Sequence, residues 1–96
     1  MSAEISVTVA EAADGWDADV TVRDADGSVT EHRVTVRRAD VERLAGGRSA
    51  EELVRASFAF LLEREPKESI LRRFELAVIG RYFPEYEREV GRYVGR

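Results

Sequence analysis

Cysteine is absent from this chain, and histidine, lysine, tryptophan and methionine occur once each. The lack of cysteine excludes disulfides and thiolate-held metal sites, and it is typical of a reducing compartment. The most apolar run, residues 58–62, is far shorter than the roughly 20 residues that cross a bilayer. No basic start leads into an apolar stretch, so no secretory signal is expected. The sequence therefore predicts a cytoplasmic protein without a membrane segment.

The charge is unevenly distributed. The net charge is −4 over 96 residues. Residues 1–48 hold six Arg and ten Asp or Glu, whereas residues 49–96 hold nine residues of each sign. This balance gives no electrostatic footprint for nucleic acid. The length is that of one domain, which we divide into a β-meander at 1–38 and a helical half at 39–96.

Three segments alternate apolar and polar residues with a period of two, which predicts half-buried strands at 5–9, 16–23 and 29–38. Residues 24–28 form a predicted hairpin loop with Gly27 in the left-handed conformation. That register pairs Val20 with His32 and, on the opposite face, Asp19 with Arg33. Both faces are chemically consistent in this register, which is how strand pairing is specified.

After residue 38 the apolar residues recur at the spacing of a helix. Asp40 is placed to cap a short helix, and Ser49 with Glu52 forms a capping box at the start of the main core helix. That helix must end before Pro66, which suits the first turn of another helix. Further helices are expected over 68–74, from 78, and after Pro84. The predicted fold class is α+β: a three-stranded antiparallel β-meander followed by three or four α-helices packed on one sheet face.

Motifs for catalysis, metal binding or nucleotide binding are not recognisable. His32 has no identifiable catalytic partner, which favours a buried, hydrogen-bonded strand residue over an acid–base group. Residues 24–27 resemble part of a calcium loop, but that alignment puts Val22 and Arg33 at ligand positions. No glycine-rich phosphate loop or nucleophile elbow is present. We therefore predict no catalytic residue, no metal and no cofactor.

Arginine and tyrosine residues cluster in the last third of the sequence, and this pair of residue types is enriched where proteins meet. The predicted partner-binding residues are Arg72, Arg73, Arg81, Tyr82 and Tyr86. Our first hypothesis is a non-enzymatic module that binds a protein partner or forms a homodimer through these residues. The competing interpretation is that Phe83 and Tyr86 belong to the core, with tyrosine hydroxyls at its rim.

Two other functions stay open. Residues 66–86 have a helix-turn-helix-like outline in which Arg72, Arg73 and Arg81 would face phosphate. A turn without glycine, the interruption at Pro84 and the acidic chain make nucleic-acid binding the weaker alternative. The last alternative is a small-ligand protein or enzyme without a recognisable motif, with a pocket between sheet and helices.

One part of the chain resembles other proteins. Residues 60–74 (FLLEREPKESILRRF) and 81–86 (RYFPEY) are similar to a stretch in short uncharacterised bacterial proteins. The resemblance covers roughly residues 53–90 and excludes the predicted strands. It implies a bacterial origin and carries no activity, ligand or site residue.

Overall fold

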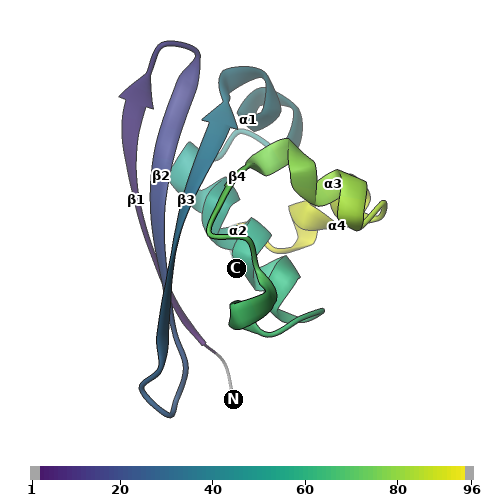
Figure 1. The fold of residues 1–96 in the computed structure, drawn as a ribbon. Helices are drawn as coiled ribbons and strands as arrows, with labels where there is room; N and C mark the ends of the chain where they lie inside the picture. The colour runs from purple at the N-terminus through teal and green to yellow at the C-terminus, as the bar shows by residue number, and fades with distance from the viewer. Residues whose placement is uncertain (1–2, 95–96) are drawn as a thin grey trace.

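The computed structural model describes residues 3–94. It consists of one β-sheet that is covered on one face by helices (Figure 1). The strands are β1 (Glu4–Ala12), β2 (Gly15–Arg23), β3 (Val29–Arg37) and β4 (Arg73–Glu75). The helices are α1 (Arg38–Leu44), α2 (Ala50–Leu62), α3 (Ile79–Tyr82) and α4 (Tyr86–Glu89). Single 3-10 turns are η1 (Lys67–Ser69), η2 (Leu76–Val78) and η3 (Val90–Arg92). None of the helices within residues 3–94 is both long enough and apolar enough to cross a bilayer.

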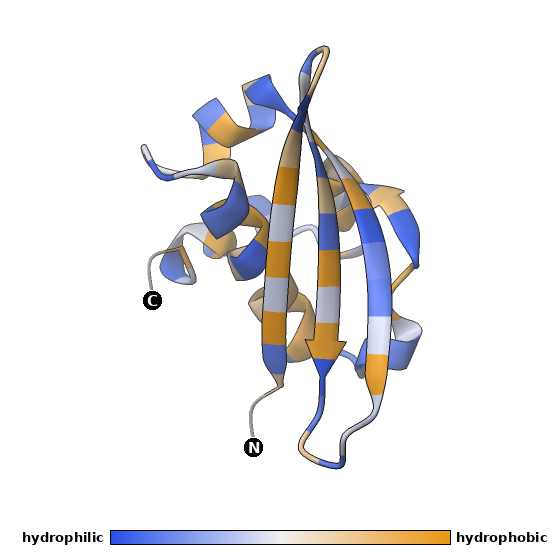
Figure 2. Cartoon of the chain, turned by 90° about the vertical axis from the view of Figure 1, so that its left-hand side faces the viewer, coloured by the Kyte–Doolittle hydropathy of each residue, from blue (hydrophilic) through white to orange (hydrophobic). Residues whose placement is uncertain are grey.

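The predicted meander is confirmed, including its register. Val20 pairs with His32 and Asp19 with Arg33. Gly27 has a φ of 89°, and Asp24 and Ser28 close the hairpin through a 3.0 Å backbone hydrogen bond. Figure 2 shows the alternation of apolar and polar residues along β1 to β3, with the helices behind the sheet. The polar face points to solvent, as the sequence indicates.

The sheet has a fourth strand that the sequence analysis did not predict. Its order is β1-β2-β3-β4, and β4 pairs with β3 in parallel, with Arg33 opposite Arg73 and Thr35 opposite Glu75. The α+β class is therefore confirmed, but the sheet is mixed and not a purely antiparallel meander. Parallel strands need a long crossover, and α1 and α2 supply it here.

α2 fills the space between the sheet and the remaining segments. Its N-terminus has the predicted capping box, since the Ser49 hydroxyl accepts from the Glu52 N–H and the Glu52 carboxylate accepts from the Ser49 N–H. The helix buries Leu53, Phe58 and Phe60 completely. Burying each such side chain contributes about 2 kcal/mol, so this helix is the main contributor to the core.

The helices expected from 78 and after Pro84 are present as α3 and α4, but two other helix predictions are wrong. Asp40 is not the cap of α1, because Arg37 occupies that position without a side-chain bond, and the buried Asp40 instead pairs with Arg43 at 2.8 Å. The helix expected over 68–74 is replaced by η1 and the extended β4. Ile70 is buried, but Leu71 is 48% exposed. Apolar residues at helical spacing are consistent with either structure in a segment this short, and pairing with β3 makes it a strand.

Candidate functional site

An apolar groove opens between the segment that leads into β4 and the helix that follows it. It has a volume of about 290 Å³. Its lining residues are Leu61, Glu65, Ser69, Ile70, Leu71, Phe74, Val78, Ile79, Tyr82 and Phe83. Leu71 and Tyr82 are exposed by 48% and 67%, and both belong to this groove. Exposed apolar side chains that gather in one hollow mark interaction surfaces more often than scattered ones do.

One wall of the groove is held against the sheet by hydrogen bonds. The Arg33 N–H donates to the Arg72 carbonyl at 2.7 Å, and His32 Nδ1 lies 2.7 Å from the Leu71 carbonyl oxygen. Both carbonyls lie in the short stretch just before β4. This anchoring leaves the Leu71 side chain in solvent while its backbone is fixed.

The opposite wall is a short helical segment. Leu76 and Ile79 are buried beneath it, which places Val78, Tyr82 and Phe83 along the groove. Phe83 meets the ring of Phe60 edge-on, with centroids 6.0 Å apart. α3 ends at Tyr82, before the Pro84 that prevents a regular continuation. Both walls are therefore tied to the core.

The three arginines predicted to bind a partner are exposed, and each is next in sequence to a residue that lines the groove. Arg72 directly follows Leu71, and Arg81 directly precedes Tyr82. Arg73 begins β4 opposite Arg33, so it lies on the polar face of the sheet, while the next residue, Phe74, lies on the face of the groove. None of the three guanidinium groups makes an ion pair or a hydrogen bond with another residue of the range 3–94. Their charges are therefore available to a second molecule.

Tyr86 is the predicted site residue that lies in the core. It is fully buried, and its ring packs against Phe60 with centroids 5.3 Å apart. The Ser57 hydroxyl donates to the Leu53 carbonyl at 2.8 Å, so the Tyr86 hydroxyl donates to Ser57 at 2.7 Å. Burial raises the pKa of Tyr86 well above its usual range. Tyr86 is therefore a core residue, as the competing interpretation has it, but its hydroxyl is buried and does not lie at the rim.

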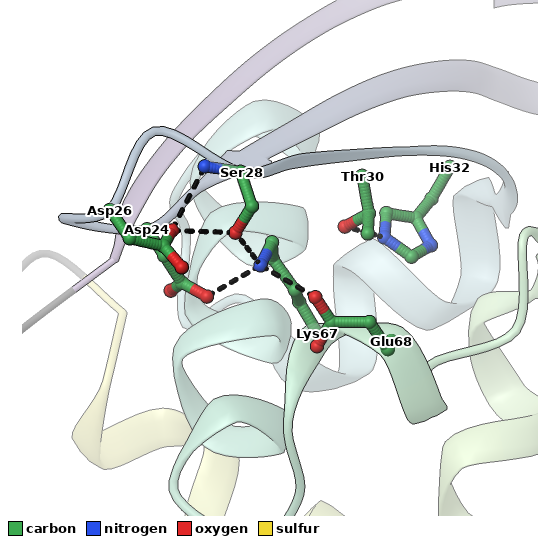
Figure 3. Close-up of polar contacts among 7 residues, drawn as sticks. All are labelled: Asp24, Asp26, Ser28, Thr30, His32, Lys67 and Glu68. Atoms are coloured by element: carbon green, nitrogen blue, oxygen red, sulfur yellow. Dashed lines mark hydrogen bonds and ion pairs between the residues drawn. The ribbon is translucent and has the colours of Figure 1, made fainter.

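Lys67 is the buried member of a polar cluster that no sequence pattern predicted (Figure 3). Its side chain is only 1% exposed, and its three N–H bonds reach Asp24 at 2.5 Å, Ser28 at 2.6 Å and Glu68 at 2.7 Å. The hydrogen bonds that Lys67 donates to the carboxylates of Asp24 and Glu68 raise its pKa, which keeps the side chain a cation. A protonated amine whose three N–H groups are all hydrogen-bonded is not a nucleophile. The role of Lys67 is therefore structural, because it holds the β2–β3 hairpin against η1.

His32 has a structural environment as well. A carbonyl oxygen only accepts, so Nδ1 carries the proton and Nε2 accepts from the Thr30 hydroxyl at 2.8 Å (Figure 3). The ring lies 5.2 Å from Phe58. Desolvation by burial lowers the pKa of His32. Its hydrogen-bond partners are a backbone carbonyl and a threonine, as expected for a buried strand residue.

Arg64, just after the end of α2, also holds the C-terminal segment in place. Arg64 pairs with Glu85 and Glu89, each at 3.0 Å, and its guanidinium lies 3.6 Å from the centroid of Phe60. Partly buried pairs of this kind fix orientation more than they add stability. Arg64 therefore sets where the segment after Pro84 lies.

Metal chemistry finds no support in the arrangement of side chains. Within residues 3–94, no three His, Cys, Asp or Glu side chains are grouped to hold a metal ion. The polar residues that line the groove are Glu65 and Ser69, together with the Tyr82 phenol. The chemistry that the groove offers is apolar contact with positive charge beside it.

No protein-family model matches this chain, and no curated protein or solved structure shows significant similarity to it.

Proposed function

We propose that this chain is a non-enzymatic protein-binding module of a bacterial cytoplasm. Its groove would accept an apolar side chain from a segment of a partner protein. Acidic residues on either side of that side chain would pair with Arg72, Arg73 and Arg81. The observation that carries the proposal is the coincidence of exposed Leu71 and Tyr82 with these three unpaired arginines.

Charge supports an acidic partner segment. The chain is acidic overall, with a net charge of −4. Most of its arginines are nevertheless paired with neighbouring carboxylates, as Arg33 is with Asp19 and Arg64 is with Glu85. The unpaired positive charge at the groove is therefore a local departure from the rest of the surface. Complementary charge at a rim increases the association rate and the specificity.

The size of the groove supports a peptide over a cofactor. At about 290 Å³ it is at the lower end of the roughly 300–1,000 Å³ of small-molecule pockets. It lies at the surface, beside the helical segment, and few polar groups converge in it. These features suit one or two apolar side chains better than a substrate, so the enzyme and small-ligand alternative has little support.

The nucleic-acid alternative loses its geometric basis. A helix-turn-helix needs two successive helices, and residues 66–86 contain η1, an extended strand and then η2 with α3. Arg73 is in a strand and Arg81 in a helix of four residues. No single element therefore presents the three arginines to a groove of DNA.

Synthetic peptides test the proposal directly. One set carries a central Leu or Phe flanked by Asp and Glu, and a matched set carries the same residue flanked by Lys and Arg. Titration into isotope-labelled protein should move the NMR signals of Leu71, Phe74 and Tyr82 with the acidic set only. Binding should weaken as salt is added, because exposed charges are screened.

Matched variants provide the controls. Val29 is exposed by 39% and lies outside the groove, so Val29→Ala should leave peptide binding unchanged, whereas Leu71→Ala should weaken it. The proposal is wrong if no acidic apolar peptide moves the groove signals, or if the basic set moves them equally.

A further inference from the structure

β1 forms an edge of the sheet that has no strand beside it. The order is β1-β2-β3-β4, so β1 pairs only with β2, and it is the outermost strand in Figure 1. This edge lies across the sheet from β4 and the groove. It is independent of the function proposed above.

The backbone groups of β1 that point outward can be identified from the hairpin. Ala12 pairs with Gly15 across a two-residue turn, and such flanking residues exchange both backbone hydrogen bonds. Alternation then directs the N–H and C=O groups of Val7, Val9 and Glu11 away from β2. The contact of Arg55 with the Ile5 carbonyl oxygen agrees, because that oxygen must also point outward.

This edge lacks the usual protection against pairing. Its nine residues pair one-to-one with β2 without a bulge, and none of them is proline or lysine. Natural edge strands are normally shortened, bulged or given inward-pointing charges and lysines. Glu4 and Glu11 are the charged residues of β1, one near each end. A long, regular and neutral central stretch is therefore left open to another strand.

We propose that a second copy of this chain pairs with β1 in antiparallel fashion, with the two-fold axis at Thr8. Thr8 is the middle residue of the strand, so this register pairs all nine residues. Val7 then lies opposite Val9 of the second copy, and both are outward-bonding positions. An isologous contact of this type closes on itself and gives a dimer.

Charge favours the same register. Glu4 lies opposite Ala12, and Glu11 lies opposite Ile5, so no two carboxylates face each other. Arg55 contacts the backbone at Ile5, which brings its guanidinium close to Glu11 of the second copy. A shift of the axis to Val9 would instead place Glu4 opposite Asp14, and like charges directly opposite are destabilising.

The helical layers are compatible with this pairing and extend it. A two-fold axis between antiparallel strands is perpendicular to the sheet, so both helical layers lie on the same face. The hollow lined by Ile5, Arg55 and Ala59, together with Ala3, Glu52, Ala56 and Tyr93, lies beside this edge. The second copy would close it and bring the two α2 helices near each other.

Sedimentation equilibrium with a charge-swap pair tests the register. The wild-type chain should show a concentration-dependent monomer–dimer equilibrium. Thr8 is exposed on the polar face, so Thr8→Glu and Thr8→Lys should fold normally, as circular dichroism would verify. Each variant places two like charges across the axis and should weaken dimerisation by roughly tenfold or more. An equimolar mixture of the two should restore it.

Thr35→Lys is the matched control, because Thr35 is exposed on the same face but belongs to the inner strand β3. It should dimerise like the wild type, and so should Leu71→Ala in the groove. A wild-type chain that stays monomeric at about 1 mM, the Kd of a very weak complex, would overturn the proposal. So would Thr8 variants that dimerise like the wild type, or a mixture that does not recover.

Discussion

His32 Nδ1 donates a hydrogen bond of 2.7 Å to the carbonyl oxygen of Leu71, 39 positions along the chain. A buried residue of β3 thereby fixes the backbone beneath the most exposed leucine of the groove. A proton added to the ring would go to Nε2, where the Thr30 hydroxyl now donates, and would leave the bond to Leu71 in place.

The burial of the neutral His32 ring predicts a pH dependence of folding. Burial holds the pKa of His32 below its ordinary value of 6.5. Because the folded state favours the neutral ring, the stabilisation is fully present above about pH 6.5. It is lost as the pH falls from there towards the lower pKa of the folded state. For one proton, the slope is at most about 1.4 kcal/mol per pH unit.

Urea unfolding between pH 8 and pH 5 measures this effect, and His32→Gln is the comparison. The variant should be less stable at pH 8, with a flatter dependence between pH 6.5 and pH 5. The hydrogen-bonded carboxylates Glu68 and Glu85 do not interfere, because their pKa values lie below 4.5. Equal pH slopes for both proteins would contradict the assignment.

The double variant Arg73→Ala with Tyr82→Ala tests the rim of the groove. Both residues are exposed, and neither belongs to the core. Binding of an acidic apolar peptide should weaken by roughly tenfold, because a few aromatic and arginine side chains dominate most interfaces. The thermal unfolding midpoint should stay the same. Arg92→Ala with Val29→Ala, two exposed residues that do not line the groove, is the paired control for isothermal titration calorimetry.

Tyr86→Phe should affect stability and not binding. The variant loses the bond from the Tyr86 hydroxyl to Ser57 but keeps the ring against Phe60. Ser57 keeps its own bond to the Leu53 carbonyl, so no buried donor is orphaned. We expect a loss of about 1 kcal/mol in the free energy of unfolding. A loss of peptide binding at unchanged stability would return Tyr86 to the list of partner-binding residues.

Lys67→Met should weaken the attachment of the β2–β3 hairpin to η1. The substitution leaves Asp24 and Glu68 without their cation, while the long apolar side chain still fills the space. The thermal unfolding midpoint should fall. Adding Asp24→Asn to this variant should cost less than Asp24→Asn costs in the wild-type chain, because the two residues share one interaction. If the two changes in the free energy of unfolding were strictly additive, Lys67 and Asp24 would not be energetically coupled.

The meander was predictable because its information is local. The alternation of apolar and polar residues along each strand and the Asp26-Gly27 turn together specify the register, including the pairing of Val20 with His32. The capping box of Ser49 and Glu52 is local in the same sense. Predictions failed where the conformation depends on distant partners. Residues 73–75 form a strand only because β3 offers an edge, which no pattern within three residues can indicate.

The candidate site was predictable in part for a related reason. The arginines and the tyrosine of residues 72–82 were the signal in the sequence, and four of the five predicted partner-binding residues are exposed there. Tyr86 was misplaced because a tyrosine can be buried once its hydroxyl finds a partner, and Ser57 lies 29 positions away in sequence. The exposure of Leu71 was not predictable while a helix was expected over 68–74, because it follows from the extended structure there. The single lysine of the chain was the one signal for the Lys67 cluster.

The parallel pairing of β4 with β3 also implies an order of events in folding. Arg33 and Arg73 can meet only after the intervening 39 residues, with α1 and α2 among them, have been arranged. Contacts of such long sequence separation form late, and a three-residue strand at an edge has few hydrogen bonds to hold it. The wall of the groove that contains Leu71 is therefore the last part of the sheet to assemble and the first to open. Its amides should exchange with solvent sooner than those of β2, and a partner segment bound there would slow that exchange.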